Sequence, residues 1–503
     1  MPFEVFPYTN FHELNLDWIV DKVHDLTVEY IKTQNELKAV EDDFVNLKNY
    51  VDNYFASTDF AELADQVLHE MLNNGELTTL FAQYTLRIYS NVAEMKADNL
   101  LIEGSRAKTL GYYYASDRGS ASYFITSSTF EGFYETLSNG LKAYLVKEPK
   151  INMAQVGILP DTDVTNLLQN ALSYYTDIEI PYGTYYTNGT LSVINDNTKI
   201  NFNNAVFNQN ISASGTFITC HKNNFVLENV IINYPTSPLS TTPNCVVLYQ
   251  SKNSVIRNVK ITKPFGIGIA IENSTDCRVQ DCEVSYAQGH KAGLWIGAGV
   301  DHITVERLYS HHNDLDGIIA DGTYQTIKNC HLAYNGQSPA PTGALGACGI
   351  YVDQDHGNHS RYMENLCEYN TESGFDLKGR FIEVAFNKSY NNGLSGIVIR
   401  DFTWGARIIG NICVSNGQNT TTSNPHTWGK SGINTQGRVQ SIIISNNVCF
   451  SGSGADQDYG IKLLPGTNND VNITGNICTN NATGGIDITQ STEGNVQTSN
   501  NIV

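Results

Sequence analysis

The sequence has few basic residues. Lys and Arg together number 31 among 503 residues, against 51 for Asp and Glu, so the formal net charge is −20. Nucleic acids and anionic membrane surfaces are bound chiefly by positively charged protein surfaces, so this balance argues against both partners. Long apolar runs are also missing, because the chain has no stretch of about 18 apolar residues. We therefore expect a soluble protein without membrane insertion.

Signals for secretion and for metal binding are missing as well. Residues 1–10 contain no basic segment followed by an apolar one, the pattern of a secretory signal. The ten cysteines are scattered between Cys220 and Cys478, without a CxxC motif or a Cys/His cluster. Free thiols are therefore predicted, with no metal site and no required cofactor.

The first part of the chain has a heptad pattern. Between Leu16 and Tyr54, apolar residues alternate spacings of three and four with a single break. Such a repeat makes one narrow apolar stripe per helix, which needs partner helices for its burial. An α-helical coiled-coil stalk is predicted, and a homotrimer is favoured because the large Tyr30 and Phe44 fit a parallel dimer poorly. An intramolecular helical hairpin is the alternative, although no Gly or Pro interrupts residues 17–55.

Two segments follow this stalk. A second helix is expected to begin near Ser57 or Thr58 and to end at residues 73–75, where Gly75 allows a left-handed exit. Residues 86–146 are rich in Tyr and contain alternating segments, which predicts a small β-rich module. The predicted domains are 1–83 (helical and coiled-coil region), 84–148 (β-rich module) and 149–503 (remainder).

An irregular repeat beyond residue 220 determines the predicted fold. One half of the repeat is a Gly followed by alternating aliphatic residues, and the other half is a polar residue before a short strand. The copies of the first half are Gly268, Gly293, Gly317, Gly349, Gly374, Gly396, Gly432, Gly460 and Gly485. Those of the second half are Asn258, Asp281, Arg307, Asn329, Asn365, Asn387, Asn411, Asn447, Asn476 and Asn501. Two longer steps, at residues 335–348 and 416–431, predict protruding loops.

This repeat indicates a parallel β-helix. Short strands between Asn and Gly turns exclude a helical solenoid, which would show a 3.6-residue period. The coils are expected to stack at about 4.8 Å and to share one core, with turn asparagines hydrogen-bonding along the stack. Cys413, Cys449 and Cys478 are predicted to share one column as small core side chains.

Two resemblances add to this interpretation. Residues 161–172 (DTDVTNLLQNAL) and 178–186 (IEIPYGTYY) resemble the entry segment of the pectate-lyase-like superfamily, which implies a right-handed parallel β-helix with a short capping helix. Residues 8–19 (YTNFHELNLDWI), 74–77 (NGEL) and 109–113 (TLGYY) resemble phage tailspike and appendage proteins. That resemblance implies a virion-attached homotrimer that contacts the phage tail through its N-terminus and engages a bacterial surface glycan.

The register of the repeat brings residues that are distant in the chain side by side. In each Gly-Ile-x-Ile strand, the second and fourth residues after Gly face outward. The first outward column reads Ala270, Trp295, Ile319, Tyr351, Asp376, Val398, Asn434 and Lys462, and the second reads Glu272, Gly297, Asp321, Asp353, Lys378, Arg400 and Gln436. Aromatic rings that stack on sugars, beside carboxylates that supply acid and base, suit a polysaccharide.

The candidate catalytic residues are therefore Asp321, Asp353 and Asp376. Asp321 and Asp353 would lie one coil apart, near the roughly 5 Å separation of retaining glycosidases, whereas Asp353 and Asp376 are nearer the inverting separation. The candidate substrate-binding residues are Trp295, Tyr351, Asp355, His356, Lys378, Arg380 and Arg400. The function predicted from these residues is a glycan depolymerase, with hydrolysis favoured.

Several alternatives remain open. The outward charges could be a solvated ladder of ion pairs. The chain could be a receptor-binding spike without catalysis, or a lyase in which carboxylates hold Ca²⁺ and Arg400 or Lys378 removes a proton. Teichoic acid is a further substrate that the resemblance to phage appendages implies.

Overall fold

The computed structural model describes residues 45–46, 60–77, 85–209, 216–235, 243–337, 347–352, 356–418, 429–452 and 456–503. The chain divides into two compact units, Met1–Thr85 and Leu86–Val503. In the first unit, α3 (Phe60–Asn73) ends where the sequence predicts, and Gly75 follows it with a φ of 79°. The predicted coiled-coil stalk lies outside the described residues, apart from Val45 and Asn46, so the stalk stays a prediction. In the described parts of the chain, no helix has the length and apolar character needed to cross a lipid bilayer.

The second unit begins with a small five-stranded sheet at the place of the predicted β-rich module. Its order is β1-β2-β3-β5-β4, with bounds β1 (Arg87–Tyr89), β2 (Arg106–Thr109), β3 (Ala121–Thr126), β4 (Tyr134–Thr136) and β5 (Lys142–Leu145). Helix α5 (Val92–Ala97) is capped by Asn91, whose side chain accepts a hydrogen bond from the backbone N–H of Glu94. Val92 and Met95 of this helix are buried in a core of the module's own. The module thus has a core cluster distinct from that of the rest of the unit.

A helix caps the first coil of the β-helix. β6 (Lys150–Asn152) and η1 (Met153–Val156) precede α6 (Thr165–Tyr174), which buries Leu168 and Leu172 in the main core. The Asp163 side chain accepts hydrogen bonds from the backbone and hydroxyl of Thr165, which satisfies polar groups at the start of this helix. These contacts confirm the capping helix that the resemblance implies.

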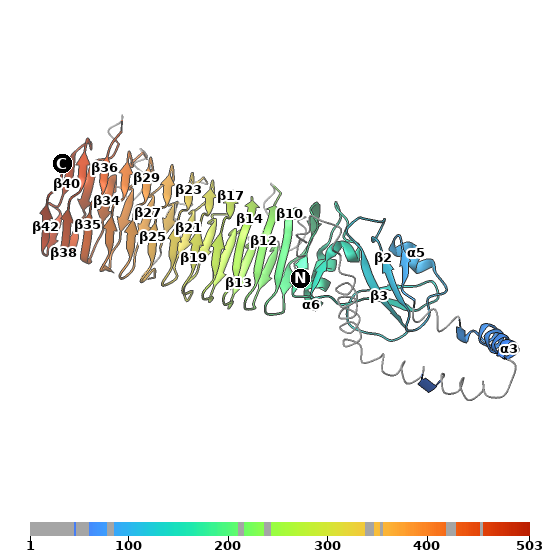
Figure 1. Cartoon of the computed structure of the whole chain (residues 1–503). Coiled ribbons are helices and arrows are strands. Elements are labelled where there is room, and N and C mark those ends of the chain that lie inside the picture. The colour runs from blue at the N-terminus through green and yellow to red at the C-terminus, as the bar shows by residue number, and fades with distance from the viewer. Residues whose placement is uncertain are drawn as a thin grey trace, which may run out of the picture. The chain divides into compact units, whose positions relative to one another are not determined.

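The rest of the unit is a solenoid of parallel strands (Figure 1). One wall is a 12-stranded sheet of β9 (Leu191–Val193), β11 (Ile218–Cys220), β13 (Val246–Tyr249), β15 (Ile269–Glu272), β18 (Leu294–Ile296), β21 (Ile318–Ala320), β24 (Ile350–Tyr351), β27 (Phe375–Leu377), β30 (Ile397–Ile399), β34 (Ser431–Thr435), β37 (Tyr459–Leu463) and β40 (Gly484–Asp487). Each strand pairs in parallel with the corresponding strand of the next coil, which confirms the predicted parallel β-helix.

The remaining strands form the other walls, which we call the second stack. They are β7 (Asp177–Glu179), β8 (Thr184–Thr187), β10 (Lys199–Gln209), β12 (Val226–Asn233), β14 (Val255–Thr262), β16 (Arg278–Gln280), β17 (Glu283–Ser285), β19 (Thr304–Glu306), β20 (Tyr309–His311), β22 (Thr326–Lys328), β23 (His331–Ala333), β25 (Arg361–Met363), β26 (Leu366–Glu368), β28 (Glu383–Ala385), β29 (Lys388–Tyr390), β31 (Thr403–Trp404), β32 (Arg407–Ile409), β33 (Ile412–Val414), β35 (Val439–Ser445), β36 (Val448–Phe450), β38 (Gly466–Thr474), β39 (Ile477–Thr479), β41 (Ser491–Glu493) and β42 (Val496–Ser499). Alternate residues of the 12-stranded sheet and of the second stack point inward. They fill one core that runs from Ile151 to Cys478. All ten cysteines are free and buried, and Cys413, Cys449 and Cys478 share one column as predicted.

Asparagines hydrogen-bond along the stack, which confirms that prediction. One ladder consists of Asn365, Asn387, Asn411, Asn447, Asn476 and Asn501. Within it, Asn411 Nδ2 donates to the Val384 carbonyl at 2.8 Å and to Asn447 Oδ1 at 2.9 Å. These buried bonds satisfy backbone groups at a corner where the strands end.

The predicted polar series is wrong in one respect. Asn329 donates its backbone N–H to the Met363 carbonyl, whereas the N–H of Cys330 is bonded to Asn365 Oδ1. Asn258, Asp281, Arg307 and Asn329 thus occupy the turn position before the ladder, with φ between 51° and 54°. The predicted series therefore changes from the turn position to the ladder position, one residue later, between Asn329 and Asn365. Asn suits both the left-handed turn and the ladder, so the sequence does not distinguish them.

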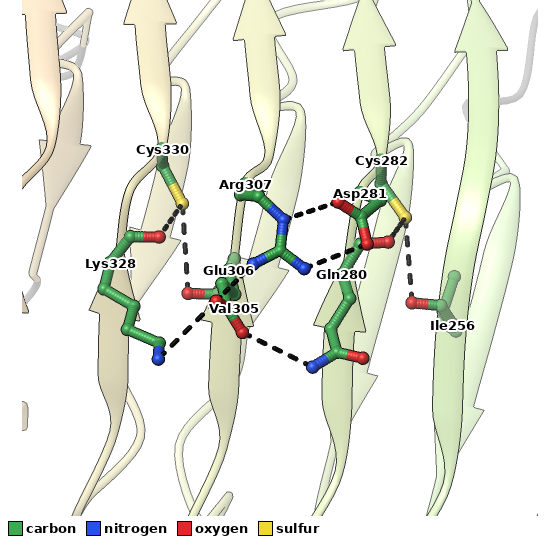
Figure 2. A network of polar contacts seen from close by, with 9 residues as sticks. All are labelled: Ile256, Gln280, Asp281, Cys282, Val305, Glu306, Arg307, Lys328 and Cys330. Atoms are coloured by element: carbon green, nitrogen blue, oxygen red, sulfur yellow. Dashed lines mark hydrogen bonds and ion pairs between the residues drawn. The ribbon is translucent and has the colours of Figure 1, made fainter.

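Figure 2 shows this corner on neighbouring coils. Arg307 reaches back to Asp281, with Nε 2.6 Å from Oδ1 and Nη2 3.0 Å from Oδ2. Cys282 directly follows Asp281, and Cys330 directly follows Asn329 at the same place on another coil. The thiols of both cysteines face inward and donate hydrogen bonds to backbone carbonyls. The ion pair is about half exposed, so it contributes little to stability.

Candidate functional site

The first outward column has the predicted register. Backbone pairing aligns Trp295 with Ile319, Ile319 with Tyr351, and Tyr351 with Asp376. The column continues through Val398, Asn434 and Lys462 to Asp487. Each member is therefore one coil, about 4.8 Å, from the next.

A cleft of about 370 Å³ opens on this face over β24 to β37. Four of the predicted site residues line it, namely Tyr351, Asp376, Lys378 and Arg400. Other polar residues that line it are Glu372, Ser373, Ser395, Asp401, Asn434 and Gln436. The stacking of the coils thus places residues from several coils in one concave site.

Arg400 is the central cation of the cleft. Its Nε lies 2.6 Å from Asp376 Oδ1, in an ion pair rather than a well-aligned hydrogen bond. Its Nη2 donates to the Val352 carbonyl at 2.8 Å, and its guanidinium carbon lies 4.7 Å from the centroid of the Tyr351 ring. One face of this ring is therefore covered by a guanidinium, an arrangement that stabilises both groups.

These contacts keep Arg400 charged. Burial alone would lower the pKa of Arg400, but the negative charge of Asp376 and the contact with Tyr351 outweigh it and leave the pKa above its usual value. A general base accepts a proton from the substrate, so it must be deprotonated at the working pH. The geometry therefore argues against Arg400 as the base of the lyase alternative.

Three carboxylates border the cleft. Asp376 lies on β27, Glu372 lies in the turn before that strand, and Asp401 follows Arg400 one coil later. Asp401 Oδ1 accepts the backbone N–H of Arg438 at 2.6 Å, which fixes its orientation. Sequence reasoning missed Glu372 and Asp401, because they lie on turns that the strand repeat does not align.

A fourth acid, Asp316, is buried near these carboxylates, with only 1% of its surface exposed. Its Oδ1 accepts the backbone N–H of Cys348 at 2.7 Å, and its Oδ2 has no partner among the described residues. Burial, together with the charges of Glu372 and Asp376, raises the pKa of Asp316 well above its usual value. Sequence reasoning missed Asp316 too. A usable signal was present, because an acid precedes Gly317, whereas Ala292 and Cys348 precede the corresponding glycines of other coils.

The other predicted site residues that the structure describes do not line the cleft. Trp295 lies on β18 and Asp321 follows β21, both on earlier coils of the same wall. His356 lies outside the strands, in the connection that follows β24, and Arg380 lines a separate groove. Asp353 and Asp355 fall outside the described residues, as do residues 338–346 and 419–428 of the two predicted loops. The catalytic roles of Asp321 and Asp353 stay predictions.

The calcium site of the lyase alternative also stays a prediction. The described residues contain no group of three His, Cys, Asp or Glu side chains placed to hold a metal ion. In the cleft, Asp376 is already paired with Arg400, and Lys378 adds a second cation. This donor set does not fit Ca²⁺, which takes six to eight oxygen ligands.

The family model described as the right handed beta helix region matches residues 175–316 and 316–503. The chain belongs to the right-handed β-helix family. Among curated protein sequences, none matches this β-helix protein.

Solved structures of similar fold include proteins of several kinds. The A-module of the mannuronan C-5 epimerase AlgE4 from Azotobacter vinelandii has a TM-score of 0.56 and 15% identity, over 69% of this chain and 99% of that one. The enzymatically active domain of tailspike protein 2 from bacteriophage CBA120 has a TM-score of 0.51 and 14% identity, over 80% and 61%. The catalytic unit of the GH87 α-1,3-glucanase of Streptomyces thermodiastaticus has a TM-score of 0.51 and 13% identity, over 73% of each chain. At such identities, the similarity shows the fold alone.

Proposed function

We propose that this β-helix protein is a phage tailspike or appendage subunit that binds a bacterial surface polysaccharide in the cleft and hydrolyses it. The observation that carries the proposal is the meeting of three carboxylates, Glu372, Asp376 and Asp401, with Arg400 in one cleft on the outer wall. The N-terminal heptad pattern supports an attached homotrimer, and the phage tailspike among the proteins of similar fold fits this class.

The cleft contains the groups that glycoside hydrolysis needs. The reaction uses one carboxylate as base or nucleophile and one carboxylic acid as proton donor. Arg400 stabilises the charged form of Asp376, which suits the base or nucleophile. Glu372 and Asp401 are then the candidates for the proton donor.

A buried amide supports ligand binding in the cleft. Asn434 lines the cleft with 1% of its surface exposed, and its Nδ2 donates to Ser395 Oγ at 2.6 Å. Its Oδ1 has no hydrogen-bond partner in the described parts of the chain. Buried acceptors are normally satisfied, so a hydroxyl of a bound sugar is a fitting donor.

The second candidate is a receptor-binding spike without catalysis. The observation in its favour is that Arg400 neutralises Asp376 and at the same time contacts Val352 and Tyr351. Such a cross-linked wall can shape a binding site with no reaction taking place.

Release of reducing ends from bacterial capsule or wall preparations tests the proposal. The wild-type chain is expected to shorten the glycan, and Asp376→Asn to reduce the rate at least about 100-fold while still binding cells. Asp281→Asn, at the exposed pair with Arg307, is the matched control and should leave the rate unchanged. Undiminished release by Asp376→Asn would remove the assignment, and binding without shortening by the wild type would establish the non-catalytic spike.

The same assay decides between the acids that sequence and structure favour. Glu372→Gln and Asp401→Asn test the two donors in the cleft, and Asp321→Asn and Asp353→Asn test the residues predicted from the repeat. Light scattering of the full chain tests the homotrimer, and antibody labelling of virions tests the tail location. A monomer that is absent from virions would contradict both.

A further inference from the structure

A second groove, of about 540 Å³, begins where the cleft ends. The lining of the cleft reaches Asp401 and Gly437, and the lining of the groove starts with the next residues, Phe402 and Arg438. Lys378, which lines the cleft, places its Nζ 5.3 Å from the centroid of the Phe402 ring, which lines the groove. The two hollows are therefore neighbours around the same turns of successive coils.

An aromatic ladder ends in this groove. Its rings follow one another, one per coil, at centroid distances between 4.7 and 5.3 Å, in the order His302, Tyr324, His359, Phe381 and Trp404. The first four rings are stacked, and the ring of Trp404 is tilted by 42° against that of Phe381. Rings within a ladder cover one another's faces, so they offer a ligand only their edges. Trp404 pairs on the next coil with Gln440, and no ring of the described residues stacks on its other side. Trp404 is 42% exposed and is thus the one member of the ladder that can present an aromatic face to the groove.

Two guanidinium groups border the same groove. Arg380 and Arg438 are both exposed and line it, and neither forms an ion pair with an acid in the described parts of the chain. Asp401 accepts the backbone N–H of Arg438, not its guanidinium. In a chain with a net charge of −20, two such arginines in one groove make a local site for an anion.

A buried hydroxyl completes the site. Thr403 lines the groove with 1% of its surface exposed, and its Oγ1 has no hydrogen-bond partner among the described residues. An unpaired buried hydroxyl is costly unless a ligand satisfies it. This observation is independent of the arginines and of the ladder.

We propose that this groove is a subsite for an acidic sugar, a hexuronate residue of the glycan that occupies the cleft. The proposal rests on the glycan-binding function proposed above. The exposed face of Trp404 stacks on the apolar face of the pyranose, and Arg380 and Arg438 bind its carboxylate. The Thr403 hydroxyl forms a hydrogen bond with a sugar hydroxyl. The glycan chain passes over Phe402 and Lys378 into the cleft.

The test uses the full chain and calorimetric titration with oligogalacturonate, oligomannuronate and oligoglucuronate, each beside its carboxyl-reduced form. At least one oligohexuronate is expected to bind at least about tenfold more tightly than its reduced counterpart. Arg380→Gln, Arg438→Gln and Trp404→Ala should each weaken that binding about tenfold or more. Arg407→Gln, an exposed arginine on β32 outside both hollows, is the matched control and should change nothing.

The outcomes separate this inference from the proposed hydrolysis. No preference for any oligohexuronate over its reduced form would overturn the inference, as would binding that Arg380→Gln and Arg438→Gln leave unchanged. Binding that depends on these arginines, in a protein that cleaves no glycan, would leave the inference standing and remove hydrolysis. Because Arg380, Trp404 and Arg438 are exposed, their variants should keep the wild-type thermal unfolding, which excludes misfolding as the cause of lost binding.

Discussion

Arg400 Nε lies 2.6 Å from Asp376 Oδ1, although Asp376 lies on β27 and Arg400 directly follows β30 of the next coil. Both side chains are only about one-fifth exposed, at 20% and 18%. Because each charge is largely removed from water, the two groups stabilise the fold only as a pair. The same pair holds the wall of the cleft in place through the contacts of Arg400 with Val352 and Tyr351.

Substitutions at this pair should be strongly coupled. Arg400→Met is expected to lower the free energy of unfolding by about 2–3 kcal/mol, because it leaves the Asp376 charge without its guanidinium. The double variant Arg400→Met/Asp376→Leu should recover to within about 1 kcal/mol of the wild type, since neither charge remains. Urea unfolding of the wild type, of the single variants Arg400→Met and Asp376→Leu, and of the double variant measures the coupling. A loss in the double variant equal to the sum of the losses in the two single variants would show that the pair has no coupling energy.

The asparagine ladder should respond more strongly in its middle than at its end. Asn411→Ala leaves the Val384 carbonyl and the backbone N–H of Asn387 without their partners, at about 1–3 kcal/mol for each group. Asn501 is partly exposed at the end of the ladder, where water can replace its bonds, so Asn501→Ala should cost less. Thermal unfolding of both variants checks the order, and a larger loss at Asn501 would contradict the role of burial.

The ten cysteines should be inert in the folded protein. All are buried, and burial raises the pKa of Cys245 and of Cys282 to about 12. Thiolates react and thiols do not, so a thiol reagent at pH 8 should label none of them before unfolding and all ten in denaturant. Counting labels by mass spectrometry gives the answer, and rapid labelling of any one cysteine in the native protein would show that its coil opens locally.

The repeat made the architecture predictable from the sequence. A solenoid coil needs an inward aliphatic at every second strand position and a residue that tolerates positive φ at its corners, so Gly, Ile and Asn recur at fixed spacing. The column from Trp295 to Lys462 follows directly from that spacing. The slip between Asn329 and Asn365 could not be foreseen, because the same residue type suits both neighbouring positions.

The site was predictable only where strands carry it. Asp376 lies on β27 and Arg400 directly follows β30, and both were found from the register. Glu372, Asp401 and the position of Arg380 depend on the path of turns, which the strand spacing does not determine. The turn after β27 carries Arg380 around the corner into the second groove, away from the cleft in which the sequence pattern grouped it.

Asp316 should make the protein less stable as pH rises. Burial raises its folded pKa well above the unfolded value of about 3.9, so the native state holds more protons than the unfolded state between these two values. Stability from this residue is therefore complete below the unfolded pKa and is lost as pH rises towards the folded pKa. Asp316→Asn cannot ionise and can still accept the backbone N–H of Cys348. The variant should match the wild type near pH 4 and become more stable than it by up to about 1.4 kcal/mol per pH unit above that.

Asp281→Asn gives the opposite sign in the same experiment. The hydrogen bonds from Arg307 lower the pKa of Asp281, so its contribution to stability is present above the unfolded pKa and is lost as pH falls through the folded one. The wild type should thus exceed Asp281→Asn slightly at neutral pH and lose that advantage in acid. Urea unfolding of the three proteins between pH 4 and pH 8 measures both trends. A difference between Asp316→Asn and the wild type that stays constant over this range would mean that Asp316 is ionised in the folded protein, and a charged carboxylate would then have to be solvated near the cleft.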